Sequence, residues 1–108
     1  MFKASIPPSH LAFQIGECAQ IHTGGLLQAT PHSVRGSNLP NVSRETFAVF
    51  MEPGMFETMN VPEGRSPEQA QDQRAAASLP TGVPPISARW DPSMDFGEFT
   101  EKTLSSYY

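Results

Sequence analysis

The chain has 108 residues, a formal net charge of −4 and a pI near 5.2. This length is typical of one small domain with one core. The acidic balance and scattered Lys and Arg residues exclude nucleic acids and acidic membranes as expected partners. A single cysteine, Cys18, excludes an internal disulfide and is typical of a reducing compartment. No long apolar run occurs near the N-terminus, so we expect no signal peptide or membrane helix and take the cytoplasm as the default location.

The first half of the chain has the pattern of short β-strands. Apolar and polar residues alternate over 11–15, and further segments lie at 18–22, 26–34 and 44–51. Thr23-Gly24-Gly25 is expected to form a turn, because glycine adopts positive φ without steric cost. Four short strands joined by tight turns predict an antiparallel sandwich or barrel.

The second half has a different composition. Residues 62–85 are rich in Pro, Gln, Ser, Ala and Gly, which predicts an extended or disordered linker with a helical turn over 67–77. Asp95 is a candidate N-cap for a short C-terminal helix that carries Phe96, Phe99 and Leu104 on one side. The aromatic residues of this helix are expected to dock on the sheet.

Two short motifs carry the clearest chemistry. His32 ends one apolar segment, and Arg44-x-Thr46 opens the next. Arg44 and Thr46 share one face of the predicted strand and supply a guanidinium and a hydroxyl, the groups that clamp a carboxylate. Neutral imidazole is a good iron ligand. The alternatives are a structural strand-end histidine and a solvated edge-strand arginine.

The other candidate residues favour simpler interpretations. His10 and His22 flank predicted strands and are expected to be exposed. Cys18 is expected to be a small buried side chain and not a nucleophile, since no basic partner is evident. Phe47, Val49 and Met51 form the expected core face of their strand.

The order of the motifs resembles one enzyme family. Phe13-Gln14-Ile15-Gly16-Glu17 is followed by Thr23-Gly24-Gly25, by Ala29-Thr30-Pro31-His32-Ser33-Val34, and by Arg44-Glu45-Thr46-Phe47. Over residues 10–53 this order resembles the C-terminal half of the isopenicillin N synthase-like 2-oxoglutarate/Fe(II) oxygenase domain, closest to its plant-type members.

The resemblance implies a fold, a cofactor set and a site. The fold is mainly β, the C-terminal half of a double-stranded β-helix (jelly roll) at residues 1–55. A Pro/Gln-rich linker at 56–92 and a C-terminal helix at 93–108 follow it. His32 would be the second iron histidine, and Arg44 and Thr46 would bind the 2-oxoglutarate carboxylate. The reaction would be oxidation of an unidentified small molecule with Fe(II) and 2-oxoglutarate.

One part of the family pattern has no counterpart here. The first ligand pair, His-x-Asp, is expected roughly fifty residues before the second histidine, ahead of Met1. His10-Leu11-Ala12 and His22-Thr23-Gly24 do not match it. We therefore expect an oxygenase fragment, truncated and inactive as an isolated chain. The alternative is a non-catalytic binding or interaction module that pairs with another chain through exposed strand edges.

Overall fold

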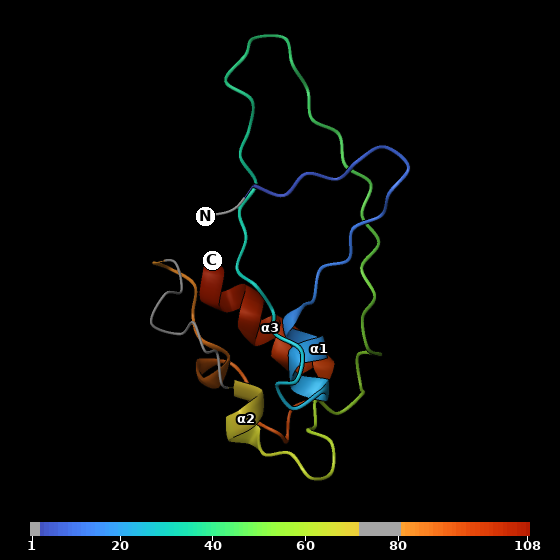
Figure 1. The fold of residues 1–108 in the computed structure, drawn as a ribbon. Helices are drawn as coiled ribbons and strands as arrows, with labels where there is room; N and C mark the ends of the chain where they lie inside the picture. The colour runs from blue at the N-terminus through green and yellow to red at the C-terminus, as the bar shows by residue number, and fades with distance from the viewer. Residues whose placement is uncertain (1–2, 72–80) are drawn as a thin grey trace.

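The computed structural model describes residues 3–71 and 81–108. Within these ranges it contains three α-helices, α1 (Glu17–His22), α2 (Pro67–Gln71) and α3 (Phe96–Tyr107), and the 3-10 turn η2 (Ile86–Ala88). They gather into a compact helical body at one end of the molecule (Figure 1). No helix in the described ranges is long and apolar enough to cross a membrane.

The predicted mainly-β fold is wrong. The described residues contain no β-strand, and their β-pairing is limited to an isolated antiparallel bridge between Thr58 and Asp95. The chain is therefore not half of a jelly roll. A strand needs a neighbour to satisfy its main-chain groups, and the alternating segments at 11–15 and 44–51 have none among the described residues.

The buried core lies in the helical body and comes from distant parts of the sequence. Met59, Ala70, Ile86 and Trp90 pack with Ile21, Phe96 and Phe99, and half-buried Cys18 and Val61 lie against them. The first four fall in the predicted linker at 56–92, and Ala70 falls in the stretch 62–85 that is expected to be extended or disordered. The expectation of disorder is therefore wrong at α2, which contributes Ala70 to the core. Residues 72–77 of the predicted helical turn lie outside the described residues, and α2 occupies its start.

The start of helix α3 is explained by the residues around Asp95. Asp95 accepts a hydrogen bond from the Glu98 N–H at 2.8 Å, and Glu98 accepts one from the Asp95 N–H at 3.0 Å, forming a capping box. Phe96 and Phe99 are buried as expected, whereas Leu104 is exposed. The helix docks on other helices and loops instead of a sheet.

Helix α1 replaces the strand that was predicted over residues 18–22. It begins after Gly16 and ends at Thr23, where Gly24 and Gly25 adopt φ values of +60° and +85°. The Gly25 N–H donates to the Gln20 carbonyl at 2.8 Å, and the Gly24 N–H donates to the Ile21 carbonyl at 2.9 Å. The expected Gly-Gly turn is thus present, as the end of a helix.

Residues 30–53 form a long loop that we call the arm (Figure 1). Its two limbs, 30–38 and 42–53, meet at a tip where Asn41 has a φ of 59°. Every residue from 30 to 52 is exposed. The hydrogen bonds found for the arm among the described residues are local ones, from Leu39 N–H to Ser37 Oγ and between His32 and Thr30. Residues 30–49 of the arm therefore lie outside the packed body, whereas its end at 50–53 lies beside α1.

Gly25 is required by a close approach between α1 and α2. A Cβ added there would lie 2.1 Å from the Gln69 carbonyl oxygen, and its φ of +85° is unfavourable for any residue with a side chain. We predict that Gly25→Ala lowers the free energy of unfolding by about 2 kcal/mol or more. Gly36→Ala is the control, because a Cβ at that position meets nothing within 4 Å. Urea unfolding measures both, and equal stabilities would contradict the packing described.

Candidate functional site

The predicted site residues all lie on the arm. His32 is on the first limb, Arg44 and Thr46 are on the second, and all three are exposed. The two limbs run apart between the body and the tip (Figure 1). The His32 ring nitrogen Nδ1 lies 3.3 Å from the Thr30 carbonyl oxygen. The structure brings Arg44 and Thr46 near each other through their spacing on one limb, and it leaves His32 on the other.

The described residues supply few candidate ligands for a metal ion near His32. In the part of the chain that the structure describes, no group of three His, Cys, Asp or Glu residues is placed to hold a metal. A single exposed imidazole supplies one ligand, whereas a non-haem iron site of this kind uses three protein ligands.

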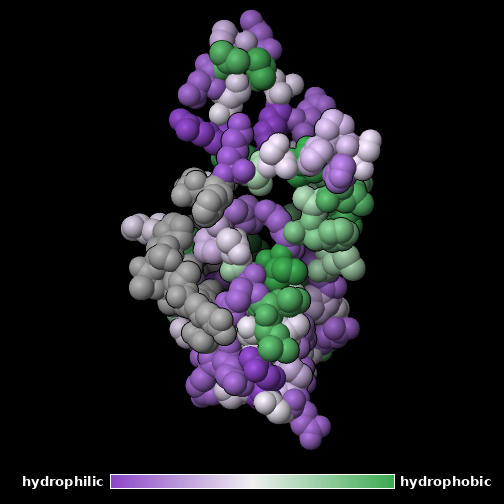
Figure 2. Space-filling model, viewed as in Figure 1, coloured by the Kyte–Doolittle hydropathy of each residue, from purple (hydrophilic) through white to green (hydrophobic). Residues whose placement is uncertain are grey.

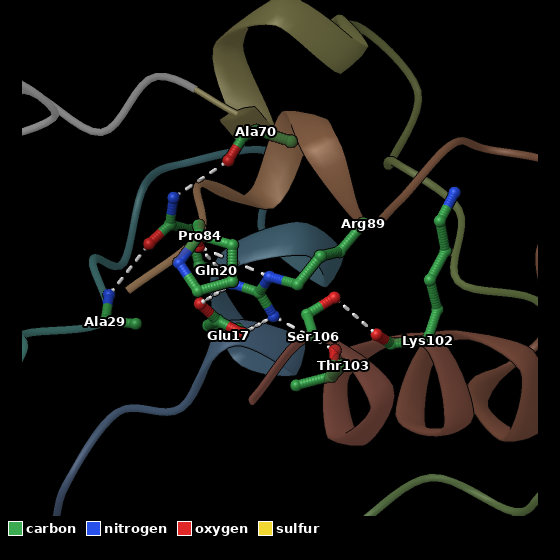
Figure 3. A network of polar contacts seen from close by, with 9 residues as sticks. All are labelled: Glu17, Gln20, Ala29, Ala70, Pro84, Arg89, Lys102, Thr103 and Ser106. Carbon is green, nitrogen blue, oxygen red and sulfur yellow. Dashed lines mark hydrogen bonds and ion pairs between the residues drawn. The ribbon is translucent and has the colours of Figure 1, made fainter. Parts of the chain in front are cut away.

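Polar side chains do converge inside the helical body, around Arg89 (Figure 3). The Arg89 side chain is fully buried and forms a bidentate ion pair with Glu17, with N–O distances of 2.6 and 2.8 Å. The guanidinium also donates to Thr103 Oγ1 at 2.9 Å and to the Pro84 carbonyl at 3.0 and 3.3 Å. The guanidinium carbon lies 5.8 Å from the centre of the Phe99 ring.

These contacts use all five N–H donors of the guanidinium. Arg89 therefore has no donor left for a ligand, and its role is to join α1, the segment before η2 and α3. Arg89 is fully buried and the Glu17 side chain is 26% exposed, so the ion pair is partly buried and its contacts hold these elements together.

Gln20 makes a second cross-connection inside the body (Figure 3). This buried side chain donates from Nε2 to the Ala70 carbonyl at 2.9 Å, and its Oε1 accepts from the Ala29 N–H at 2.9 Å. It links α1 to α2 and holds Ala29, the residue directly before the arm. The Arg65 guanidinium adds hydrogen bonds to the Gly24 carbonyl at 2.7 and 3.0 Å.

A shallow surface groove lies between α1 and the end of the arm. Its lining includes Cys18 and His22 from the helix and Phe50, Met51 and Glu52 from the arm. Burial, followed by the negative charges of Glu17 and Glu52, raises the pKa of the Cys18 thiol from 9.0 to about 11. The thiol is therefore protonated at neutral pH, and the protonated form is the less nucleophilic one.

Sequence reasoning missed Arg89 and Gln20, the two buried polar residues of the body. The partner of Arg89 lies 72 positions away and that of Gln20 lies 50 positions away. No local pattern predicts such long-range pairs. The run Ser87-Ala88-Arg89-Trp90 carries a weak signal, since an arginine beside a tryptophan in a polar segment is a candidate for burial.

The comparisons with known proteins add no assignment: no family model, no curated protein and no solved structure matches this chain. The geometry therefore supports two conclusions. The body is a structural unit whose buried polar groups are satisfied by one another. The arm, like the exposed segment 3–15, is a part of the described chain whose main-chain and apolar groups are available to a partner.

Breaking the buried ion pair should be costly. We predict that Glu17→Gln lowers the free energy of unfolding by about 3 kcal/mol, because it leaves a buried guanidinium without a counter-charge. The double variant Glu17→Leu/Arg89→Met should recover most of that loss. Glu52→Gln, at an exposed carboxylate, is the control and should change stability by less than about 0.5 kcal/mol. Thermal and urea unfolding measure all three, and a Glu17→Gln protein as stable as the control would contradict the role given to Arg89.

Proposed function

We propose that this chain is a binding module that adds an extended segment of its arm to an edge strand of another polypeptide. The observation that carries the proposal is the arm itself, which is exposed along its length and has unpaired main-chain groups in the described structure. Such segments bind by strand addition, in which main-chain hydrogen bonds give affinity and alternate side chains give specificity.

The side chains of the second limb suit this kind of binding. Phe47, Val49 and Met51 alternate along the limb and are 94%, 73% and 89% exposed. Figure 2 shows apolar surface along one side of the molecule above the body. In an extended segment these residues face one way, so pairing with an edge strand would cover them together. Exposed apolar side chains in a continuous row are typical of an interaction surface.

Hydrogen bonds to the body hold the residues at both ends of the arm, Ala29 before it and Met55 after it. Gln20 accepts a hydrogen bond from the Ala29 N–H. The Gly97 N–H of α3 donates one to the Met55 carbonyl at 2.9 Å. A loop with fixed ends loses less conformational entropy on binding than a free tail of the same length. The proposed role of the helical body is thus to present the arm.

A synthetic peptide of alternating valine and threonine, flanked by lysines, is a suitable probe. We predict that the full chain raises the fluorescence anisotropy of the labelled peptide in a saturable way. Ala48→Pro/Val49→Pro removes main-chain donors from both edges of the limb and should abolish the effect. Ala48→Ser/Val49→Thr keeps the donors and is the control. Absence of binding to the unaltered chain, or equal binding by the proline variant, would overturn the proposal.

A second candidate is a contribution to a 2-oxoglutarate/Fe(II) oxygenase site that another polypeptide segment completes. The order of motifs around His32, Arg44 and Thr46 favours it, together with the exposure of all three side chains. In that arrangement Arg44 and Thr46 would hold a carboxylate and His32 would supply an imidazole. The substrate would be a small molecule.

An anaerobic titration with Fe(II) and 2-oxoglutarate separates the two candidates. The binding-module proposal predicts no charge-transfer absorption from the isolated chain, because the described residues place no three metal-ligating side chains together. An absorption band that His32→Ala and Arg44→Lys remove, and that His10→Ala leaves unchanged, would favour the oxygenase over the module.

A further inference from the structure

The second limb of the arm has a sequence that is complementary to itself. When two copies of residues 44–52 are placed antiparallel about Ala48, Arg44 of each copy lies opposite Glu52 of the other, and Phe47 lies opposite Val49. Opposite charges and aromatic–β-branched pairs are the cross-strand combinations that stabilise antiparallel strands. The pattern therefore points to a partner with the same sequence.

The surface that such pairing needs is available. Residues 44–52 are exposed, they lie in one uninterrupted extended limb (Figure 1), and no hydrogen bond in the described structure involves their main chain. Pro53, which has no N–H donor, follows directly and ends the pairing at one side. Asn41, with its positive φ, bends the chain before the other side.

The charges select one register. Shifting the strands by two residues places Arg44 opposite Phe50 or opposite Gly54, and both charge pairs are lost. A register centred between Arg44 and Glu45 also opposes charges, but it reaches the bend at Asn41 within a few residues. Pairing about Ala48 keeps both charge pairs over the whole straight part of the limb.

We propose that two copies of this chain form a symmetric dimer in which residues 44–52 pair antiparallel about a two-fold axis at Ala48. This inference rests on the proposed strand-adding function and names its partner as a second copy. The interface is isologous, so each copy gives and receives the same contacts. It is small, and the dimer should therefore be weak and in rapid exchange with the monomer.

Sedimentation velocity across a range of concentrations tests the charge pairs. The unaltered chain should self-associate, and Arg44→Glu or Glu52→Arg should each weaken association roughly tenfold, because like charges then face each other twice. Arg44→Glu/Glu52→Arg restores opposite charges and should restore association. Arg35→Glu, on the other limb, makes the same charge change as Arg44→Glu and should have no effect.

Disulfide trapping tests the register independently, in a Cys18→Ser background. Ala48→Cys should form a covalent dimer under mild oxidation, since this residue faces its own copy with Cα atoms about 4.5–5.5 Å apart. Val49→Cys should not, since its own copy is a diagonal neighbour roughly 7–8 Å away. Equal trapping of both variants would overturn the register.

The outcomes also separate this inference from the function on which it rests. A chain that stays monomeric at all concentrations, yet still binds the valine–threonine peptide, overturns the dimer alone. A dimer that persists in Ala48→Pro/Val49→Pro overturns the dimer through this limb. A chain that neither self-associates nor binds the peptide overturns both proposals.

Discussion

The buried guanidinium of Arg89 is the interaction on which the rest of this structure depends. It ties Glu17 of α1 to Thr103 of α3 and to the main chain before η2. Removing such a charge from water costs free energy that is offset only when every N–H donor has a partner. The positions of α1, α3 and the segment before η2 are therefore coupled. The apolar residues Ile21, Ile86 and Phe99 then pack around a fixed frame. The need to satisfy all the donors of Arg89 thus favours one packing arrangement of this small core.

In contrast to the body, the arm has main-chain groups that are mostly without hydrogen-bond partners among the described residues. Its alternating residues have strand character, but the described chain offers them no neighbour, so their main-chain groups and the side chains of Phe47, Val49 and Met51 face solvent. Exposed edges of this kind bind other chains, whether a foreign strand or a second copy. The polar groups of the body are thus satisfied internally, whereas those of the arm would be satisfied by the proposed partner. Arg44 shows the consequence, because in a dimer it would face Glu52 and would not be free to hold a carboxylate.

Local features of this structure could be predicted from the sequence, and long-range ones could not. Asp95 and the spacing of Phe96 and Phe99 predicted α3, and Gly24-Gly25 predicted a turn, because capping and positive φ depend on adjacent residues. The strand patterns over 11–15 and 44–51 were interpreted as a sheet, but an alternating pattern gives only the capacity to pair. The segment at Cys18–His22 is helical instead, and Glu17 and Gln20 have partners far along the chain that no local pattern predicts. His32, Arg44 and Thr46 were identified by their types and order, which do not determine where a long loop places them.

Residue-resolved amide hydrogen exchange, at a concentration where the chain is monomeric, tests most directly whether a self-satisfied body presents an unpaired arm. The account predicts strong protection in α3 and around Trp90, and exchange close to that of an unstructured peptide throughout residues 30–53. Slow exchange of residues 44–52 in the monomer would contradict it, because the limb would then already be paired within its own chain.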